Sequence, residues 1–162
     1  MPNLTEFLRE QAERLRSDSS GIESERTKWV ESVDRLLRQM IDWLEEADPN
    51  RVLSKTISTM NRVEERLGAY EVKWLSIYLG DRQVRVVPVA SDVIPAIGSR
   101  GDLDIRARGR VDMLDTIGFR KYMLYRGVEG QEEQWTMIDD RTYEMQNLTR
   151  ATFEAAVQSL LE

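Results

Sequence analysis

A bulky apolar residue recurs at every seventh position through the first quarter of the chain. These residues are Leu8, Leu15, Ile22, Trp29, Leu36 and Trp43. Seven residues make two turns of an α-helix, so the six side chains lie along one stripe of a helix. An apolar stripe in water has to be covered, either by another helix of this chain, by its own sheet or by a second copy of the protein.

The helical pattern is strongest over residues 22–47, and a shorter segment ahead of it, residues 4–15, keeps the same spacing. Five residues, Ser17-Asp18-Ser19-Ser20-Gly21, interrupt the pattern, and Ser20 followed by Glu23 has the spacing of a capping box. The seven-residue register nevertheless runs through the interruption. We therefore expect a short helix followed by a long one, with one long bent helix over residues 3–47 as the alternative.

A second long helix is predicted after Asp48-Pro49, because Asp48 suits a helix cap and Pro49 suits the first helical turn. The residues that follow at helical spacing are Val52, Leu53, Thr56, Ile57, Met60, Val63 and Leu67. Gly68 suits the left-handed residue that ends a helix. Because the connection is so short, the two helices are expected to lie antiparallel, as a helical hairpin.

From Tyr70 onward the apolar period changes to two, which is typical of β-strands. Gly80-Asp81 predicts a tight turn, and Pro88 indicates that the second strand of this hairpin is an edge strand or ends in a bulge. Residues 103–113, 119–128, 134–138 and 143–148 fit further strands. A last helix is predicted after Thr149, which can cap it.

This order of elements predicts a single α+β domain over residues 1–162. In it, an N-terminal antiparallel helical hairpin, with a short preceding helix, packs on a mostly antiparallel sheet of five to six strands, and a C-terminal helix closes the fold. The helical part is expected in residues 1–70, and the sheet and C-terminal helix in residues 71–162. Two independent domains are not expected, because a half-buried sheet needs the helices as its cover.

Composition removes most of the usual catalytic chemistry. The 162 residues include no cysteine, hence no thiolate nucleophile, disulfide or iron–sulfur cluster, and no histidine, the commonest acid–base group near neutral pH. Carboxylate, Tyr and Ser–Lys chemistry would survive this exclusion, but the chain has neither a Gly-x-Ser-x-Gly nor a Ser-x-x-Lys motif. We therefore expect a protein without a cofactor and without enzymatic activity.

Charge narrows the set of partners. The net charge is −6, with an acidic C-terminal part and a mildly basic centre, so general affinity for nucleic acid is disfavoured. Residues 1–6 lack the basic start and apolar run of a secretory signal, and no stretch approaches the ~20 apolar residues that a membrane helix needs. We expect a soluble cytoplasmic protein that does not contact membranes.

The first candidate site is the N-terminal part of the apolar stripe. Residues 22–43 can pack against the predicted second helix and the sheet. Leu4, Phe7, Leu8 and Leu15 have no partner that is adjacent in sequence, so an exposed face there would form an interaction patch, for a protein partner or for a homo-oligomer. Ordinary packing within the chain is the competing interpretation.

The second candidate site is a row of arginines, Arg106, Arg108 and Arg110, at alternate positions of a predicted strand. Their spacing of about 6.6 Å is comparable to that of successive phosphates, so the row could bind an anion, a nucleic acid or an acidic protein surface. The favoured interpretation is a solvated sheet face, because Asp102, Asp104 and Asp112 alternate with them on the same face.

Two acidic pairs, Asp102/Asp104 and Asp139/Asp140, are the candidates for a carboxylate site for Mg²⁺ or Ca²⁺. Neither pair has the spacing of a calcium-binding loop, and Asp139-Asp140-Arg141 is also typical of a turn. Gly98-Ser99-Arg100-Gly101 lacks a following helix and both familiar nucleotide-binding spacings, so it predicts only a turn.

The sequence therefore favours a non-enzymatic protein–protein interaction module, chaperone- or adaptor-like and expected to form a homo-oligomer. Its size and acidity are similar to those of small α+β chaperones of secretion systems, a similarity of class that no motif supports. Binding of an anionic ligand or a nucleic acid at the arginine row is the alternative, and a carboxylate-metal enzyme is a second, weaker one.

Overall fold

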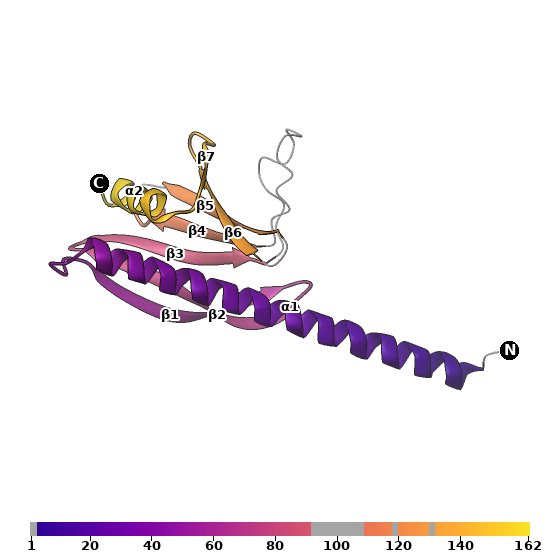
Figure 1. Ribbon diagram of the computed structural model, residues 1–162. Coiled ribbons are helices and arrows are strands. Elements are labelled where there is room, and N and C mark those ends of the chain that lie inside the picture. The colour runs from indigo at the N-terminus through magenta and orange to yellow at the C-terminus, as the bar shows by residue number, and fades with distance from the viewer. Residues whose placement is uncertain (1–2, 92–108, 118–119, 130–131) are drawn as a thin grey trace.

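The computed structural model describes residues 3–91, 109–117, 120–129 and 132–162. A long helix is followed by seven strands and a short C-terminal helix (Figure 1). The elements are α1 (Leu4–Ala47), β1 (Ser54–Glu64), β2 (Gly68–Leu79), β3 (Arg82–Ala90), β4 (Arg110–Asp115), β5 (Lys121–Glu129), β6 (Glu132–Asp139), β7 (Met145–Asn147) and α2 (Arg150–Leu161). The predicted α+β class and the largely antiparallel sheet are thus confirmed.

Helix α1 is a single continuous helix of 44 residues, about 66 Å long at 1.5 Å per residue. The side-chain Oδ1 of Asn3 accepts a hydrogen bond from the backbone N–H of Glu6 at 2.9 Å and caps its first turn. Ser20 does not begin a new helix, so the short separate helix that the capping-box spacing predicted is wrong. Continuous backbone hydrogen bonding outweighs the weak helical preference of residues 17–21.

The predicted helical hairpin is also wrong, because residues 54–64 form strand β1. This strand pairs with β2 without a register shift, from Ser54 opposite Tyr78 to Glu64 opposite Gly68. Three of the six residues in Ser54-Lys55-Thr56-Ile57-Ser58-Thr59 are β-branched and the others are polar, a composition that suits a half-exposed strand at the edge of a sheet. Gly68 does take the left-handed conformation expected of it, with φ +71°, but it does so in the turn of a β-hairpin.

Asp48 stops α1 and turns the chain back into the sheet. Its carboxylate accepts hydrogen bonds from the backbone N–H groups of Val52 and Leu53, each at 2.8 Å. The sequence signal for a cap was therefore real, but the groups it satisfies belong to the connection to β1, not to the first turn of a helix.

The seven strands form one antiparallel sheet in chain order, β1 to β7, which is one or two strands more than expected. Gly80-Asp81 forms the two-residue turn between β2 and β3, as predicted. Pro88 lies in a central strand, so it marks no edge, and the register between β3 and β4 shifts between Pro88 and Ala90. The bulge that the proline predicted is thereby confirmed.

Both described helices lie on the same face of the sheet: α1 contacts β2, and α2 contacts α1, β3 and β4 (Figure 1). The core between these layers contains the fully buried Trp29, Leu37, Leu75, Met113 and Phe153. A smaller buried cluster of Met123, Tyr125 and Ile138, with Met145 against it, comes from alternate positions of β5 and β6. Within the described residues, no helix is both long and apolar enough to span a membrane.

Candidate interaction surface

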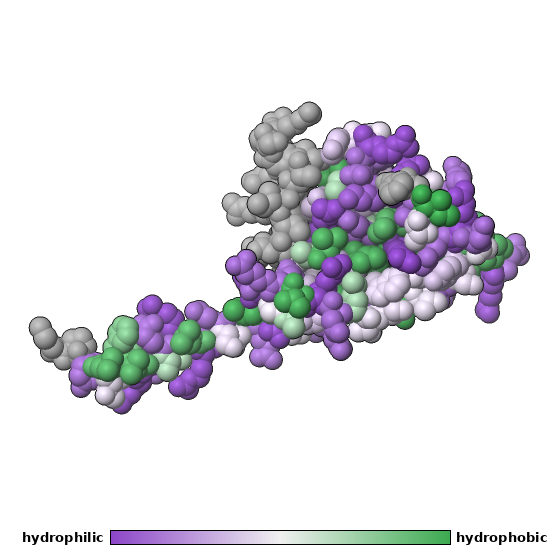
Figure 2. Space-filling view, turned by 180° about the vertical axis from the view of Figure 1, so that it is seen from behind, coloured by the Kyte–Doolittle hydropathy of each residue, from purple (hydrophilic) through white to green (hydrophobic). Residues whose placement is uncertain are grey.

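The N-terminal part of α1 projects beyond the sheet (Figure 1). We call residues 4–21 the arm. Its apolar side chains are largely exposed: Leu4 by 70%, Phe7 by 53%, Leu8 by 55% and Leu15 by 67%. Figure 2 shows apolar side chains gathered on this projecting end, flanked by polar ones. The structure thus places all four residues of the predicted stripe together on one free-standing segment.

The arm meets the body of the molecule between Ile22 and Trp29. Ile22 is half-buried against the core, and Trp29 is completely buried. Glu25 anchors this stretch to the β1–β2 turn through an ion pair with Arg66, at 2.6 Å. Because Leu8, Leu15, Ile22 and Trp29 are seven residues apart, they share one side of the helix. The same side of α1 is therefore exposed in the arm and buried where the helix lies over the sheet.

The buried part of the stripe is covered within the chain, as expected, but by different elements. The predicted second helix does not exist, and the sheet and α2 take its place. The rings of Trp43 and Phe153, for example, lie 5.4 Å apart across the contact between α1 and α2. The β1–β2 turn contacts α1 at Glu25, and nothing in the described residues covers Leu4, Phe7, Leu8 or Leu15 in the same way.

The arm also contains five consecutive residues with weak helical preference. Ser17, Asp18, Ser19, Ser20 and Gly21 together cost about 3 kcal/mol relative to alanine in a helix. Elsewhere in α1 the burial of an apolar face offsets such costs, but the arm has little tertiary packing. A partner that covered the arm would supply the missing stabilisation.

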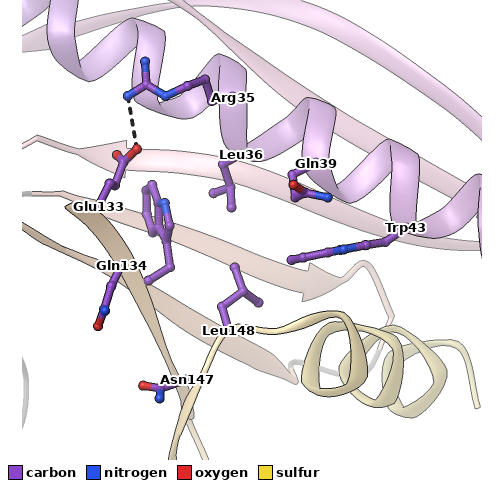
Figure 3. Close-up of a pocket in the computed structure, with 9 residues that line it drawn as sticks. Arg35, Leu36, Gln39, Trp43, Glu133, Gln134, Asn147 and Leu148 are labelled. Atoms are coloured by element: carbon purple, nitrogen blue, oxygen red, sulfur yellow. Dashed lines mark hydrogen bonds and ion pairs between the residues drawn. The ribbon is translucent and has the colours of Figure 1, made fainter. Parts of the chain in front are cut away.

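A groove with a volume of about 450 Å³ lies between α1 and the strands β6 and β7 (Figure 3). Its apolar lining comes from Leu36, Trp43, Trp135 and Leu148, and in Figure 3 Leu36 and Leu148 point toward each other across it. Its polar lining consists of Arg35, Gln39, Glu133, Gln134 and Asn147. Arg35, Gln39 and Trp43 are four residues apart, so the groove runs along one side of α1.

A polar cluster holds one end of the groove in place. The buried Ser32 donates a hydrogen bond to the carboxylate of Glu133, and Arg126 donates one to Ser32 Oγ at 2.8 Å. Arg35 forms an ion pair with Glu133 at 3.1 Å, and the guanidinium of Arg126 lies 5.2 Å from the centre of the Trp29 ring. The carboxylate thus ties β6 to α1 and positions Trp135 beside the helix.

Sequence reasoning missed this groove and its polar cluster. Ser32 lies 101 residues from Glu133 in the chain, and neither residue belongs to a recognisable motif. The sequence shows only that Trp43 and Trp135 are bulky aromatic residues; the structure shows that both are half-buried. No local pattern indicates that they meet.

Of the three residues in the arginine row, Arg110 lies within the described residues. Arg106 and Arg108 lie outside the described residues, as do Asp102 and Asp104. Arg110 makes a two-pronged contact with Asp112, from Nε to Oδ1 at 2.8 Å and from Nη2 to Oδ2 at 2.9 Å. Hydrogen bonding to Asp112 raises the pKa of Arg110 above its usual value. This arginine is therefore neutralised by its neighbour on the same strand face, and the pair is largely buried.

The second acidic pair forms a turn. Asp139 Oδ1 accepts a hydrogen bond from the backbone N–H of Arg141 at 2.8 Å, and its carbonyl accepts one from Tyr143 at 2.8 Å. Among the described residues no three Asp or Glu side chains lie close enough together to hold a metal ion. The turn interpretation therefore accounts for Asp139 and Asp140.

Comparison with protein-family models, curated proteins and solved structures finds no match to this chain. We therefore infer its function from its own surfaces.

Proposed function

We propose that this chain is a non-enzymatic protein–protein interaction module, chaperone- or adaptor-like, and that the arm is the surface it offers to a partner polypeptide. The observation that carries the proposal is the exposure of four large apolar side chains, by 53% to 70%, on one side of a projecting helix. Apolar patches of this kind on soluble proteins mark interaction sites.

The energetics support a partner that covers the apolar side of the arm. Burying a Leu or Phe side chain completely gains about 1.5–3 kcal/mol, so covering half of the four side chains contributes on the order of 3–6 kcal/mol. This is comparable to the helix cost of residues 17–21. Binding and ordering of the arm should therefore be coupled, and part of the binding energy is used to hold the helix.

The charge of the arm supports an apolar contact over an ionic one. Residues 4–21 carry four acidic and three basic side chains, so the segment is nearly neutral on a protein whose net charge is −6. A partner would gain little from opposite charge and would gain most from covering Leu4, Phe7, Leu8 and Leu15. An anionic ligand has less support, because Arg110 is already neutralised by Asp112.

Photocrosslinking in the full chain tests the proposal. The photoreactive residue p-benzoylphenylalanine replaces Leu8 in one variant and Glu10 in a control, because these positions point to opposite sides of the helix. We expect an adduct only from position 8, attached at a defined apolar site of one partner as mapped by mass spectrometry. A second substitution, Leu15→Glu, should remove that adduct. Equal adducts from both positions, or an adduct that survives Leu15→Glu, would overturn the proposal.

A further inference from the structure

We infer that the partner of the arm is a second copy of this chain, and that the tip of each arm inserts into the groove of the other copy. This inference rests on the proposed function, since it identifies the polypeptide that covers the arm. The chain carries both halves of such a contact: Leu4, Phe7 and Leu8 exposed at the tip, and a groove lined by Leu36, Trp43, Trp135 and Leu148.

The arm cannot fill the groove of its own chain. Phe7 and Gln39 lie on the same helix, 32 residues and so about 48 Å apart. Two copies related by a two-fold axis make the contact twice, with each arm reaching the other's groove. The groove, at about 450 Å³, accepts side chains from a helix end but not a helix about 10 Å wide.

The contact requires the two α1 helices to run antiparallel. The groove follows the side of α1 that carries Arg35, Gln39 and Trp43. When Phe7 of one copy lies beside Gln39 of the other, the two helices are centred on residue 23. A residue that precedes residue 23 in one copy then lies beside the residue that follows it by the same number in the other copy. Asp18 of each copy is then level with Lys28 of the other, which gives two pairs of opposite charge.

Gly21 fits this arrangement. A glycine inside a helix costs about 1 kcal/mol relative to alanine, and here a Cβ would meet nothing within 4 Å in the single chain. Gly21 comes fourteen residues after Phe7 and seven before Lys28, so it lies on the same side of α1. It is also two residues from the two-fold axis, where the helices would cross and where the absence of a side chain permits close approach.

Introduced thiols test the register, because the natural chain has no cysteine. Under mild oxidation the double variant Asp18→Cys/Lys28→Cys should form a disulfide-linked dimer. The two thiols of one chain cannot join, since ten helical residues separate them by about 15 Å and a disulfide needs Cα atoms within about 7 Å. The control is Glu13→Cys/Glu23→Cys, which has the same spacing on the opposite side of the helix. Equal cross-linking of both variants would overturn the inference.

Light scattering tests the contact at the tip. The natural chain should be a dimer, and Phe7→Glu should raise the Kd of dimer dissociation at least tenfold. Because Phe7 is half-exposed, the variant should keep its fold, which circular dichroism would verify. Glu10→Gln, on the other side of the arm, should leave the dimer intact. A natural chain that stays monomeric at high concentration would overturn the second copy as partner.

The two proposals can fail separately. If the chain is monomeric but the photoreactive residue at position 8 still labels a defined site on another protein, the interaction module stands and the second copy is excluded. If neither a dimer nor a specific adduct forms, both proposals fall.

Discussion

At the scale of single residues, Gly109 shows how closely the start of β4 approaches α1. Its φ is +151°, and a Cβ built there would lie 2.1 Å from Cζ3 of Trp29. The carbonyl of Gly109 also accepts a hydrogen bond from the backbone N–H of Arg126 at 2.9 Å, so the backbone is held in place. Only a residue without a side chain fits between this backbone and the fully buried indole.

Gly109→Ala should therefore destabilise the protein by on the order of 3 kcal/mol, through overpacking and backbone strain. Urea unfolding followed by tryptophan fluorescence measures the change. Gly21→Ala is the matched control: it meets no atom and sits in a helix, so it should stabilise the dilute monomer by up to about 1 kcal/mol. Equal effects of the two substitutions would contradict the account of Gly109.

Asp48 links stability to pH. Hydrogen bonds from the backbone N–H groups of Leu53 and Val52 lower the pKa of this carboxyl in the folded state. A lowered folded pKa means that its stabilising contribution is present above the unfolded pKa, at about pH 4, and is lost as pH falls through the folded pKa.

We expect Asp48→Asn to lower the Tm at pH 7 and the difference from the natural chain to shrink as pH falls below about 4. Asparagine keeps an acceptor oxygen but cannot titrate. Thermal unfolding at a series of pH values from 7 downward measures the effect. A difference that stays constant with pH would show that the charge of Asp48 is not what stabilises the turn.

At the scale of elements, the sequence predicted those helices and strands that have their own local signals. Thr149 was predicted to cap the last helix, and the structure shows a reciprocal cap: Thr149 N–H donates to Thr152 Oγ1 at 2.8 Å, and Thr149 Oγ1 accepts from Thr152 N–H at 3.2 Å. Gly80-Asp81 likewise specified the turn between β2 and β3. Both signals act over two to four residues.

Thr149→Ala should cost about 1 kcal/mol, because it leaves the first backbone N–H groups of α2 without their side-chain acceptor. Thr149→Ser, which keeps the hydroxyl, should lose much less. Chemical denaturation of both variants tests this, and equal losses would argue that the methyl group of Thr149 matters and the cap does not.

β1 was mispredicted because its local signals are ambiguous. Its apolar residues fit a helical period, and its burial alternates only weakly, since Ile57 and Val63 are exposed by 39% and 79% at the edge of the sheet. What makes residues 54–64 a strand is the backbone of β2, which offers eleven consecutive pairing positions. The periodicity of residues 54–64 alone does not indicate that a later segment will pair with them.

At the scale of the whole molecule, the helices and the sheet depend on one another. Leu37 in α1 and Phe153 in α2 are both completely buried, and both belong to the same core as Leu75 and Met113 of the sheet. Neither layer has another apolar face of this size in the described residues to bury. The single-domain prediction for residues 1–162 can therefore be tested by unfolding.

Leu37→Ala and Phe153→Ala should each lower the stability of one shared transition, by about 2–5 and 3–5 kcal/mol respectively. Far-ultraviolet circular dichroism, which follows the helices and strands, and tryptophan fluorescence should give the same midpoint for each variant. Two separate transitions, with only one shifted by each substitution, would contradict a single domain.

The sequence by itself determined the α+β class, the position of α2, the period-two region and the segment 4–15 whose apolar residues lack a neighbouring partner. These properties depend on residues within one or two turns of each other, where periodicity and caps act directly. The tertiary structure alone decided that α1 is continuous, that residues 54–64 pair as a strand, and that Ser32, Arg126 and Glu133 meet beside a groove. Those outcomes depend on backbone pairing and packing between residues far apart in the chain. A local sequence pattern does not show the energies of such contacts.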